Sequence, residues 1–408
     1  MGAFFAWLDA SENERRKVYD VIDLLAQPET VDELGLGSVR DTVADVLSPG
    51  SSTIQTRARY FFFIPWTYLK LEKYSVGASG AASASRNAEV ALITALSEAQ
   101  DPSGTIGIQS GAALRRLPSA IYWAGLGRLG FRLYSGGRDQ YHRVLDRGAR
   151  STVRDESGDI SLDGPLRGNW HPHIPEAPAR FPEGATFDLT PKEAAFFGDQ
   201  LRMHAGGSLT EFLVSLGELI VDVEYPWLHS ALLHMPAALQ QWLLDAQNFS
   251  ELMHGAQILY NLMLARKKEN ADLVTKYEAA LAEWGATVTA RRSIYSRWDS
   301  SYFWVRLKNR NPGLPQGAKD FCKEWMELVL ATTDPKRVGE LTQAAELILR
   351  REVALKRGRA RLKSQAHLDL WNGASNPEPL NYRWRITQAV VNDIVSGLRR
   401  DVGGARDA

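Results

Sequence analysis

The sequence predicts a mainly α fold, and three observations support this prediction. Helix-start motifs, in which a hydroxyl residue stands three positions before an acid or an amide, recur along the 408 residues. Apolar residues follow these motifs at three- to four-residue spacing, as the buried face of a helix requires. The alternation of apolar and polar residues that is typical of a half-buried strand is nearly absent.

The first three helix starts are Ser11-x-x-Glu14, Thr30-x-x-Glu33 and Ser52-x-x-Gln55. In each of them the hydroxyl can accept from a free backbone N–H while the acid or amide reaches back to the cap. The third leads into the aromatic run Tyr60–Tyr68, which contains Pro65. A proline removes a helical hydrogen bond, so we expect this run to form a helix that is bent near Pro65 and buried on most sides.

Pro118 and Ser119 open the next predicted helix, which ends at the glycines of Gly125-Leu-Gly127-Arg-Leu-Gly130. This spelling matches the GxGxxG of dinucleotide sites. Such a site needs a strand before the glycines and a helix that opens at them. Here the glycines lie at the end of a helix, and we interpret them as a helix terminus.

The C-terminal half contains the clearest helix start, Thr190-Pro191-Lys192-Glu193, which has proline at the first helical position. Ser208-x-x-Glu211 and Asp334-Pro335 predict two further starts. The apolar pattern from Ser250 to Trp284 predicts either one long helix or a tight pair of helices.

The length of the chain favours two domains, because a single hydrophobic core rarely serves so many residues. Residues 147–189 contain five prolines and few periodic apolar positions, which is typical of a connector. We therefore expect an N-terminal helical domain over 1–146, a C-terminal helical domain over 190–402 and a tail over 403–408.

The chain is neutral overall, with 48 basic and 48 acidic residues, but the charge is uneven. Residues 1–50 contain ten acids and four bases, a net charge of −6. Residues 285–363 contain seventeen bases and eight acids, a net charge of +9. Such unevenness can create a basic face on a neutral protein.

The single cysteine, Cys322, excludes an intramolecular disulfide and any cysteine-only metal cluster. Its place among apolar residues predicts a buried thiol. The N-terminus lacks the basic lead of a signal peptide, and Ala6 stands where a myristoylation motif needs Ser or Thr. No apolar run approaches the ~20 residues that span a bilayer. We expect a cytoplasmic protein without a membrane partner.

Two basic segments suggest binding to a polyanion. Arg350–Lys363 carries seven bases and one acid, and Arg291–Arg306 interleaves arginines with aromatic residues. This pattern suits phosphate contacts combined with stacking on bases. The plainer alternative is a solvated helix face whose arginines pair with acids of the N-terminal domain. The candidate nucleic-acid-binding residues are Arg57, Arg291, Arg292, Arg297, Trp298, Arg350, Arg351, Lys356, Arg357, Arg359 and Arg361.

An enzymatic alternative is a metal-assisted nuclease or phosphodiesterase. His171 and His173 could chelate a metal from a loop, together with the region of Asp222, Glu224 and His229. No nearby cysteine or histidine completes the first pair, and His229 and His234 lack HExxH spacing. No motif identifies a catalytic residue or a cofactor, and we expect a protein that uses no cofactor and is not an enzyme.

Three segments, WLDASENERRKVYDVIDLL, DELGLGSVRDTVADVLSPGSSTIQTRARYFFFIPW and RARLKSQAHLDLWNG…LNYRWRITQAVVNDIVSGL, carry a resemblance to a known family. They resemble an uncharacterised bacterial family that is described only as a domain of unknown function. The resemblance implies a bacterial cytoplasmic protein encoded near helicases, ATPases and other anti-phage defence genes.

The leading hypothesis from the sequence is a non-catalytic component of a bacterial anti-phage defence or DNA-processing system. Its basic helical faces would bind DNA or RNA, or a partner subunit. A scaffold whose basic surfaces meet acidic protein partners is a third possibility. The sequence does not choose between DNA and RNA.

Overall fold

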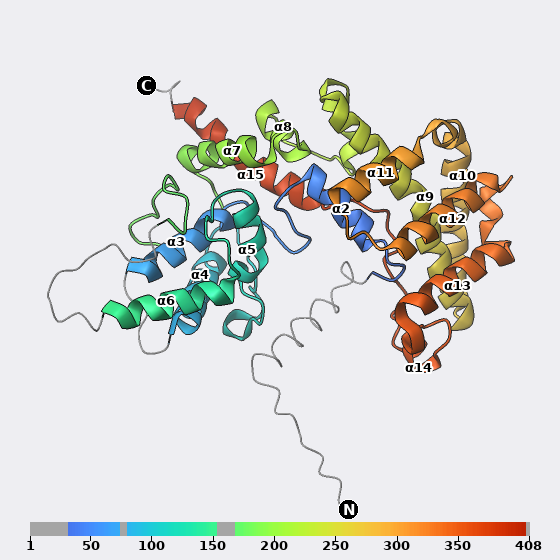
Figure 1. Cartoon of the computed structure of the whole chain (residues 1–408), viewed down its shortest axis with the longest axis horizontal. Helices are drawn as coiled ribbons and strands as arrows, with labels where there is room; N and C mark the ends of the chain where they lie inside the picture. Colours follow the sequence, from blue (N-terminus) through green and yellow to red (C-terminus); the bar gives the residue numbers. More distant parts are fainter. Residues whose placement is uncertain (1–31, 74–79, 153–167, 405–408) are drawn as a thin grey trace, which may run out of the picture. The chain divides into compact units, whose positions relative to one another are not determined.

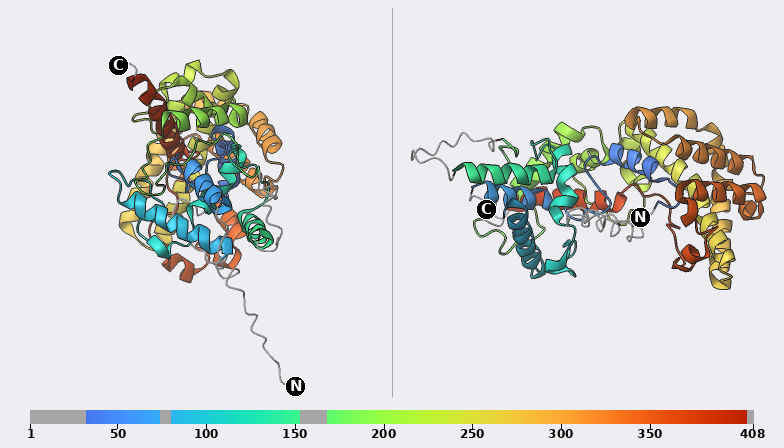
Figure 2. Two further views of the ribbon diagram at one scale, coloured as in Figure 1. Left: turned by 90° about the vertical axis from the view of Figure 1, so that its left-hand side faces the viewer. Right: turned by 60° about the horizontal axis from the view of Figure 1, so that its bottom comes forward.

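The computed structural model describes residues 32–73, 80–152 and 168–404 (Figure 1). Within these ranges every regular element is a helix, and neither Figure 1 nor Figure 2 draws a strand there. The nearest approach to a sheet among these residues is an isolated bridge between Arg132 and Trp170. The prediction of a mainly α fold is confirmed.

Contacts between Cα atoms group the chain into two compact units, each built from two separate stretches. Unit 1 comprises residues 1–44 and 224–382, and unit 2 comprises residues 45–223 and 383–408. The sequence-based division into 1–146 and 190–402, with a connector over 147–189, stays a prediction, because residues 153–167 lie outside the described residues. The expected helix start at Ser11-x-x-Glu14 and most of the 403–408 tail lie outside them as well.

Unit 2 is built from seven helices and one 3-10 turn among its described residues. They are α3 (Tyr60–Lys73), α4 (Gly80–Ser97), η1 (Gly111–Ala113), α5 (Pro118–Arg128), α6 (Arg138–Thr152), α7 (Pro191–Ala205), α8 (Leu209–Leu216) and α15 (Trp384–Gly404). Helix α2 (Gly37–Leu47) begins in unit 1 and ends in unit 2.

Helix α3 forms the aromatic core of unit 2. All nine residues Tyr60–Tyr68 are buried, as predicted, and Pro65 lies inside the helix. The rings of Phe61 and Phe62 both contact Phe197 of α7, with centroid distances of 5.0 and 6.2 Å. Edge-to-face contacts of this kind add to the area that the rings bury. The stretch is therefore core and not a surface on which a ligand stacks.

The predicted helix start at Ser52 is wrong, because α3 begins only at Tyr60. Gln55 does reach back and accepts from the backbone N–H of Ser52 at 3.2 Å. Its amide nitrogen donates to the Gly50 carbonyl at 3.1 Å, so the side chain closes a turn instead of capping a helix.

Three other predicted starts in unit 2, at Thr190, Ser208 and Pro118, are confirmed. At Thr190 both hydrogen bonds of the capping box are present, and Pro191 is the first residue of α7. Pro118 opens α5, which ends at Arg128 among the glycines. A Cβ on Gly125 would collide with the Gly50 carbonyl oxygen. The GxGxxG spelling therefore serves close helix packing at a helix end.

Unit 1 is a bundle around the longest helix. Its elements are the first part of α2, then η2 (Pro226–Leu228), η3 (Ser230–His234), α9 (Ala237–Lys267), α10 (Ala271–Arg297), α11 (Ser300–Arg310), α12 (Gln316–Ala331), η4 (Pro335–Glu340), α13 (Thr342–Lys356), η5 (Arg357–Arg359) and α14 (Gln365–Asp369). The predicted start at Asp334-Pro335 is confirmed as the 3-10 helix η4, which Asp334 caps.

Helices α9 and α10 form the tight pair that was one of the two predictions for residues 250–284. The chain turns at Lys268–Asn270, where Asn270 accepts from the backbone N–H of Leu273 at 3.0 Å and caps α10. Gly255 of α9 lies against the ring of Trp284, a position that no larger residue could take without displacing the ring. Helices α12 and α13 pack on α9 in turn.

The segment Asp32–Leu36 leads into α2 and is fixed by both polar and apolar contacts. The Asp32 carboxylate accepts from the backbone N–H groups of Leu36 and Gly37 at 2.6 and 2.8 Å, so it satisfies free donors at the helix start. Leu34 and Leu36 are buried. This segment meets the basic residues of α13.

Among the described residues no helix is both long enough and apolar enough to cross a membrane.

Candidate functional site

The basic segment Arg350–Lys363 runs along the end of α13 and through η5, and the fold divides its seven bases into two sets. One set points into unit 1: Arg351 forms hydrogen bonds with backbone carbonyls, and Lys356 and Arg361 form ion pairs with an acid. Arg357, Arg359 and Lys363 are exposed. Arg350 is exposed as well, but it forms an ion pair with Glu324 of α12. The sequence alone could not separate these sets.

Arg351 is buried and binds three backbone carbonyls. Its guanidinium donates to the carbonyls of Leu34 at 2.8 Å, Gly35 at 3.3 Å and Gly317 at 2.8 Å. Burial lowers the pKa of Arg351. The side chain thus holds the segment before α2 against α12 and α13, which is a structural role.

Lys356 and Arg361 form ion pairs with the same acid, Glu33. A second buried acid, Glu352, accepts from the backbone N–H groups of Arg361 and Leu362 at 2.9 and 3.0 Å and from the Tyr260 hydroxyl at 2.6 Å. Two carboxylates therefore face two cations, so the network carries no net charge when all four groups are ionised.

Opposing effects act on the protonation of Lys356. Burial and the Arg361 guanidinium lower its pKa to about 7. The contacts with Glu33 and Glu352 act in the other direction, because an adjacent carboxylate favours the charged ammonium. Since both carboxylates lie in contact with Lys356, we take it as protonated at neutral pH. It is an ion-pair partner and not a free base.

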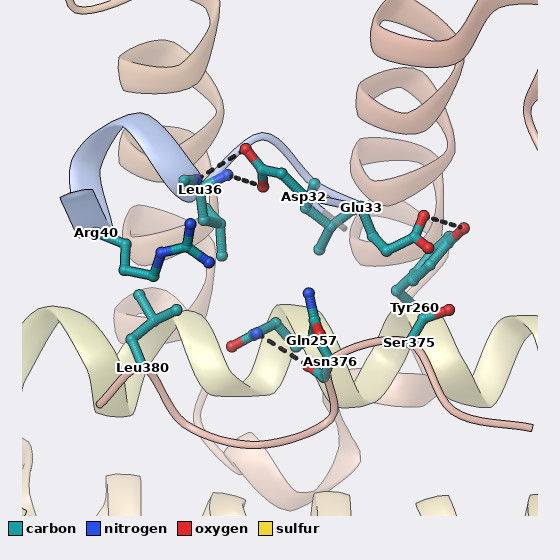
Figure 3. Close-up of a pocket in the computed structure, with 11 residues that line it drawn as sticks. Asp32, Glu33, Leu36, Arg40, Gln257, Tyr260, Ser375, Asn376 and Leu380 are labelled. Atoms are coloured by element: carbon teal, nitrogen blue, oxygen red, sulfur yellow. Dashed lines mark hydrogen bonds between the residues drawn. The ribbon is translucent and has the colours of Figure 1, made fainter. Parts of the chain in front are cut away.

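A small pocket that is open to solvent adjoins this network (Figure 3). Figure 3 shows Leu36 and Arg40 on one side of it and Gln257, Asn376 and Leu380 on the other. The Gln257 amide donates to the Asn376 carbonyl at 2.9 Å, while its buried oxygen has no hydrogen-bond partner among the described residues. The other lining residues are Asp32, Glu33, Leu34, Gly37, Tyr260 and Ser375.

The exposed bases Arg357, Arg359 and Lys363 make no ion pair with any described residue, and we call them the basic loop. The loop lies against the C-terminus of α9, because Lys267 donates to the Leu362 carbonyl at 2.6 Å. Lys268 donates to the Trp371 carbonyl at 2.8 Å. Five cations therefore gather at one end of unit 1, and those near helix ends complement the helix dipoles.

The second predicted segment, Arg291–Arg306, is built into the core of unit 1. Arg291 pairs with Glu251 at 2.7 Å, and Arg292 donates to the Leu330 and Thr332 carbonyls at 2.9 and 2.5 Å, at the end of α12. The half-buried Trp298 donates to Asp245 at 2.8 Å. Of the four candidate binding residues in this segment only Arg297 is exposed, and it donates to the Ser293 carbonyl at 2.9 Å.

The aromatic residues of that segment are also mostly unavailable for stacking. Tyr295, Phe303 and Trp304 are buried, and Tyr302 is the large exposed side chain among them. Arg306 stacks on Trp242 with 3.8 Å between its guanidinium carbon and the ring centroid, and it pairs with Asp245 at 2.5 Å. The aromatic pattern that suggested base stacking thus reflects core packing.

Arg57 belongs to unit 2 and lies in an ion network. It pairs with Asp393 of α15 at 2.9 Å and donates to the Ser103 carbonyl at 3.1 Å. Its guanidinium also lies over the Phe187 ring, 4.8 Å from the centroid. Hydrogen bonding with Asp393 raises the pKa of Arg57 although burial opposes this. The side chain joins α15 to the loop before α3.

The residues of the enzymatic alternative are not gathered into a metal site. No group of three or more His, Cys, Asp or Glu residues that could hold a metal ion occurs in the described part of the chain. His171 accepts from the backbone N–H of His173 at 3.2 Å in a loop, and His229 is buried and caps η3. Cys322 is buried, as predicted, and burial raises the pKa of its thiol.

Several residues of the site carried no signal in the sequence. Tyr260, Gln257 and Ser375 come from α9 and from the loop after α14, more than a hundred residues apart. Lys267 and Lys268 stand outside both predicted basic segments. A scan for bases near the ends of predicted helices could have found these two lysines, but not their place beside the basic loop.

A family model described as "Family of unknown function (DUF6361)" matches residues 2–397. The match confirms the resemblance to an uncharacterised family that the sequence motifs suggested. No curated protein matches the chain, and no solved structure matches it.

Proposed function

We propose that this chain, which belongs to the DUF6361 family of unknown function, is a non-catalytic component of a bacterial anti-phage defence or DNA-processing system that binds nucleic acid through the basic loop. One observation carries the proposal. Arg357, Arg359 and Lys363 are exposed at one end of unit 1 and have no carboxylate partner among the described residues.

The physical argument is electrostatic. Several arginines of the two basic segments are neutralised by acids or bound to carbonyls, as Arg351 and Arg361 are. The basic loop is different, because its charges face water. Phosphate groups can replace that water and release their counterions, which is the main driving force of sequence-independent binding to nucleic acids. Guanidinium groups also match the geometry of phosphate.

The test is a charge reversal of the loop, Arg357→Glu with Arg359→Glu and Lys363→Glu, in the full chain. Binding of a labelled single strand and of a duplex is measured by fluorescence anisotropy between low and physiological salt. We expect affinity to fall at least ten-fold, and the slope of log K against log salt to decrease by about 2 to 3, because roughly one counterion is released per phosphate contact.

A matched control reverses three exposed bases elsewhere on unit 1, Lys308→Glu with Arg310→Glu and Arg337→Glu. The control changes the net charge by the same amount. If nucleic acid binds at the basic loop, the control variant should lose much less affinity than the loop variant. Equal losses in the two variants, or no binding by the wild type at low salt, would overturn the proposal. Co-purification of an acidic protein in place of nucleic acid would favour the scaffold alternative.

A further inference from the structure

Leu370, which follows α14 directly, is an apolar side chain that faces water in unit 1. It is 79% exposed, although Leu368 and Trp371 close to it in the chain are buried. A single exposed leucine is ordinary on a protein surface. Two observations distinguish this one: the backbone that carries it is held on both sides, and the cations at the end of α9 lie beside it.

The backbone around Leu370 is held by hydrogen bonds and by buried side chains. Lys268, just after the end of α9, donates to the carbonyls of Trp371 and Asp369 at 2.8 and 3.4 Å, one on each side of the leucine. The backbone N–H of Trp371 donates to the Leu368 carbonyl at 2.9 Å, and both of these side chains are buried. The leucine is therefore presented on a fixed support, so little conformational freedom is lost when it enters an apolar site.

The cations of the basic loop and of α9 lie near Leu370. Lys267 donates to the Leu362 carbonyl at 2.6 Å, next to Lys363, while Lys268 binds the carbonyls on either side of the leucine. Because Lys267 and Lys268 are neighbours in the chain, the basic loop and the turn that carries Leu370 both lie within the reach of a lysine side chain from the end of α9. An ammonium group has three donors, so both lysines keep at least one for a phosphate.

Exposed acids lower the positive charge of this region but are outnumbered by the bases. They are Glu269 and Asp272, which stand around the start of α10, and Asp369 beside the leucine. The basic loop and the two lysines of α9 together supply five cations. An anionic partner is therefore attracted to the end of unit 1 that presents Leu370.

The aromatic residues of the described ranges 257–280 and 350–376 are not available for stacking on bases. They are Tyr260, Tyr277 and Trp371, and all three are buried. Single strands are held largely by stacking on exposed aromatic rings. Proteins that bind in the minor groove of a duplex instead insert apolar side chains such as leucine between base steps. Cations combined with an exposed leucine, and without an exposed ring in these ranges, fit a duplex.

We infer that Leu370 is a wedge that inserts between two base pairs of duplex DNA from the minor groove, while the basic loop and the α9 lysines bind phosphates. This inference rests on the proposed function of the basic loop. Insertion partly unstacks the base step and bends the duplex. The duplex must therefore be deformed when it binds, and sites at which unstacking costs little should bind best.

The test measures binding and bending of one duplex. A duplex of about 20 base pairs, the length of a typical bent site, carries a donor dye at one end and an acceptor dye at the other. The full-length variant is Leu370→Ala. Its matched control is Leu233→Ala, which shortens another leucine of unit 1 that is 82% exposed. Fluorescence anisotropy gives the affinity, and energy transfer between the dyes at saturation reports the bend.

We expect the wild type to increase energy transfer between the two ends, and Leu370→Ala to abolish this increase. The affinity of Leu370→Ala should fall about five-fold, because the burial of the leucine between bases is lost. Its slope of log K against log salt should equal that of the wild type, because no phosphate contact is removed. Leu233→Ala should bind and bend the duplex as the wild type does.

A duplex with one central mismatch separates insertion from a general apolar contact. A mismatched base is unstacked at lower cost than a paired one. The wild type should therefore bind the mismatched duplex at least about three-fold more tightly than the matched duplex, whereas Leu370→Ala should bind both equally. An equal preference for the mismatch in both proteins would contradict insertion by Leu370.

The outcomes separate the inference from the proposed function. If the basic-loop variant weakens binding but Leu370→Ala binds and bends the duplex as the wild type does, the inference fails while the proposed function stands. The same conclusion follows if the wild type binds the duplex without bending it, or binds single strands alone. Equal losses in Leu370→Ala and Leu233→Ala would also overturn the wedge. If the wild type binds no strand and no duplex at low salt, both proposals fail.

Discussion

His142 is a residue whose pKa is changed by the fold, and this change can be tested by experiment. It lies on α6 and is buried, with its ring stacked on Tyr68 of α3 at 5.7 Å between centroids. Its Nε2 lies 2.8 Å from the Tyr68 hydroxyl and 3.4 Å from that of Ser85 on α4. Burial and the nearby Arg138 lower the pKa of His142 to about 4, although Asp139 and Asp146 oppose them. A neutral imidazole accepting from Tyr68 fits this environment.

This environment predicts acid sensitivity of the fold. In the unfolded chain the histidine pKa is about 6.5. Between pH 6.5 and 4 the unfolded state therefore binds more protons than the folded state, and stability falls as the pH falls through this window. The loss reaches roughly 3 kcal/mol, because one pKa unit corresponds to about 1.4 kcal/mol.

The measurement is the free energy of unfolding in urea at pH 7 and pH 4.5, for the wild type and for His142→Gln. We expect the variant to lose less stability on acidification than the wild type. His173→Gln, which removes an exposed histidine of the same unit, serves as the control and should behave as the wild type does. An identical pH dependence in all three proteins would contradict the assignment.

At the scale of the element, unit 1 depends on glycines that let helices approach closely. Gly285 of α10 lies against the backbone of η4, where an added Cβ would be 2.5 Å from the Cα of Lys336. The neighbouring atoms are backbone and cannot rotate away. Real Cβ atoms do not approach other atoms so closely, and thus a side chain at this position would have to push η4 off α10.

We predict that Gly285→Ala destabilises the protein by about 1 to 3 kcal/mol, the usual effect of overpacking, although alanine is the better helix former. Gly198→Ala in α7 is the matched control, because no heavy atom lies within 4 Å of its added Cβ. The control should gain up to about 1 kcal/mol from helix propensity alone. Thermal unfolding of the two variants measures the contrast, and a stabilised Gly285→Ala would show that η4 is not packed as described.

At the scale of the whole molecule, the uneven charge of the sequence is partly balanced inside unit 1. Glu33 comes from the acidic N-terminal stretch, and it pairs with Lys356 and Arg361 from the basic stretch that ends at residue 363. The plainer of the two sequence interpretations, arginines that pair with acids from the N-terminal region, thus accounts for these two bases. Of the bases in Arg350–Lys363, those of the basic loop remain available to a binding partner.

Glu33→Gln tests this balance. Glu33 is 5% exposed, and its loss leaves two half-buried cations, Lys356 and Arg361, without the acid that pairs with both of them. Breaking one partner out of a buried ion pair costs about 3 to 5 kcal/mol. We expect a clear drop in the free energy of unfolding that added salt does not restore, because buried pairs are weakly screened. Glu340→Gln, which breaks the exposed pair with Arg337, should have no measurable effect.

The local features of the fold could be predicted from the sequence because they depend on residues a few positions apart. The capping box at Thr190, the glycine-ended helix at Pro118, the buried aromatic helix around Pro65 and the helical character of 250–284 all follow from such short-range chemistry. The start at Ser52 failed for a related reason, since the same side-chain contact closes a turn as readily as it opens a helix.

By itself, then, the sequence determined the mainly α fold, the helix starts at Pro118, Thr190, Ser208 and Asp334, the buried cysteine and the two basic segments. Only the tertiary structure decided which of those bases pair with acids or carbonyls and which face water. Lys356 and Arg361 meet Glu33 across more than three hundred residues, and Arg292 meets the end of α12, whereas Arg357, Arg359 and Lys363 meet no acid among the described residues. The energy of an ion pair depends on the distance in space between the two charges and weakens as that distance grows. The spacing of the two residues along the chain does not reveal this distance.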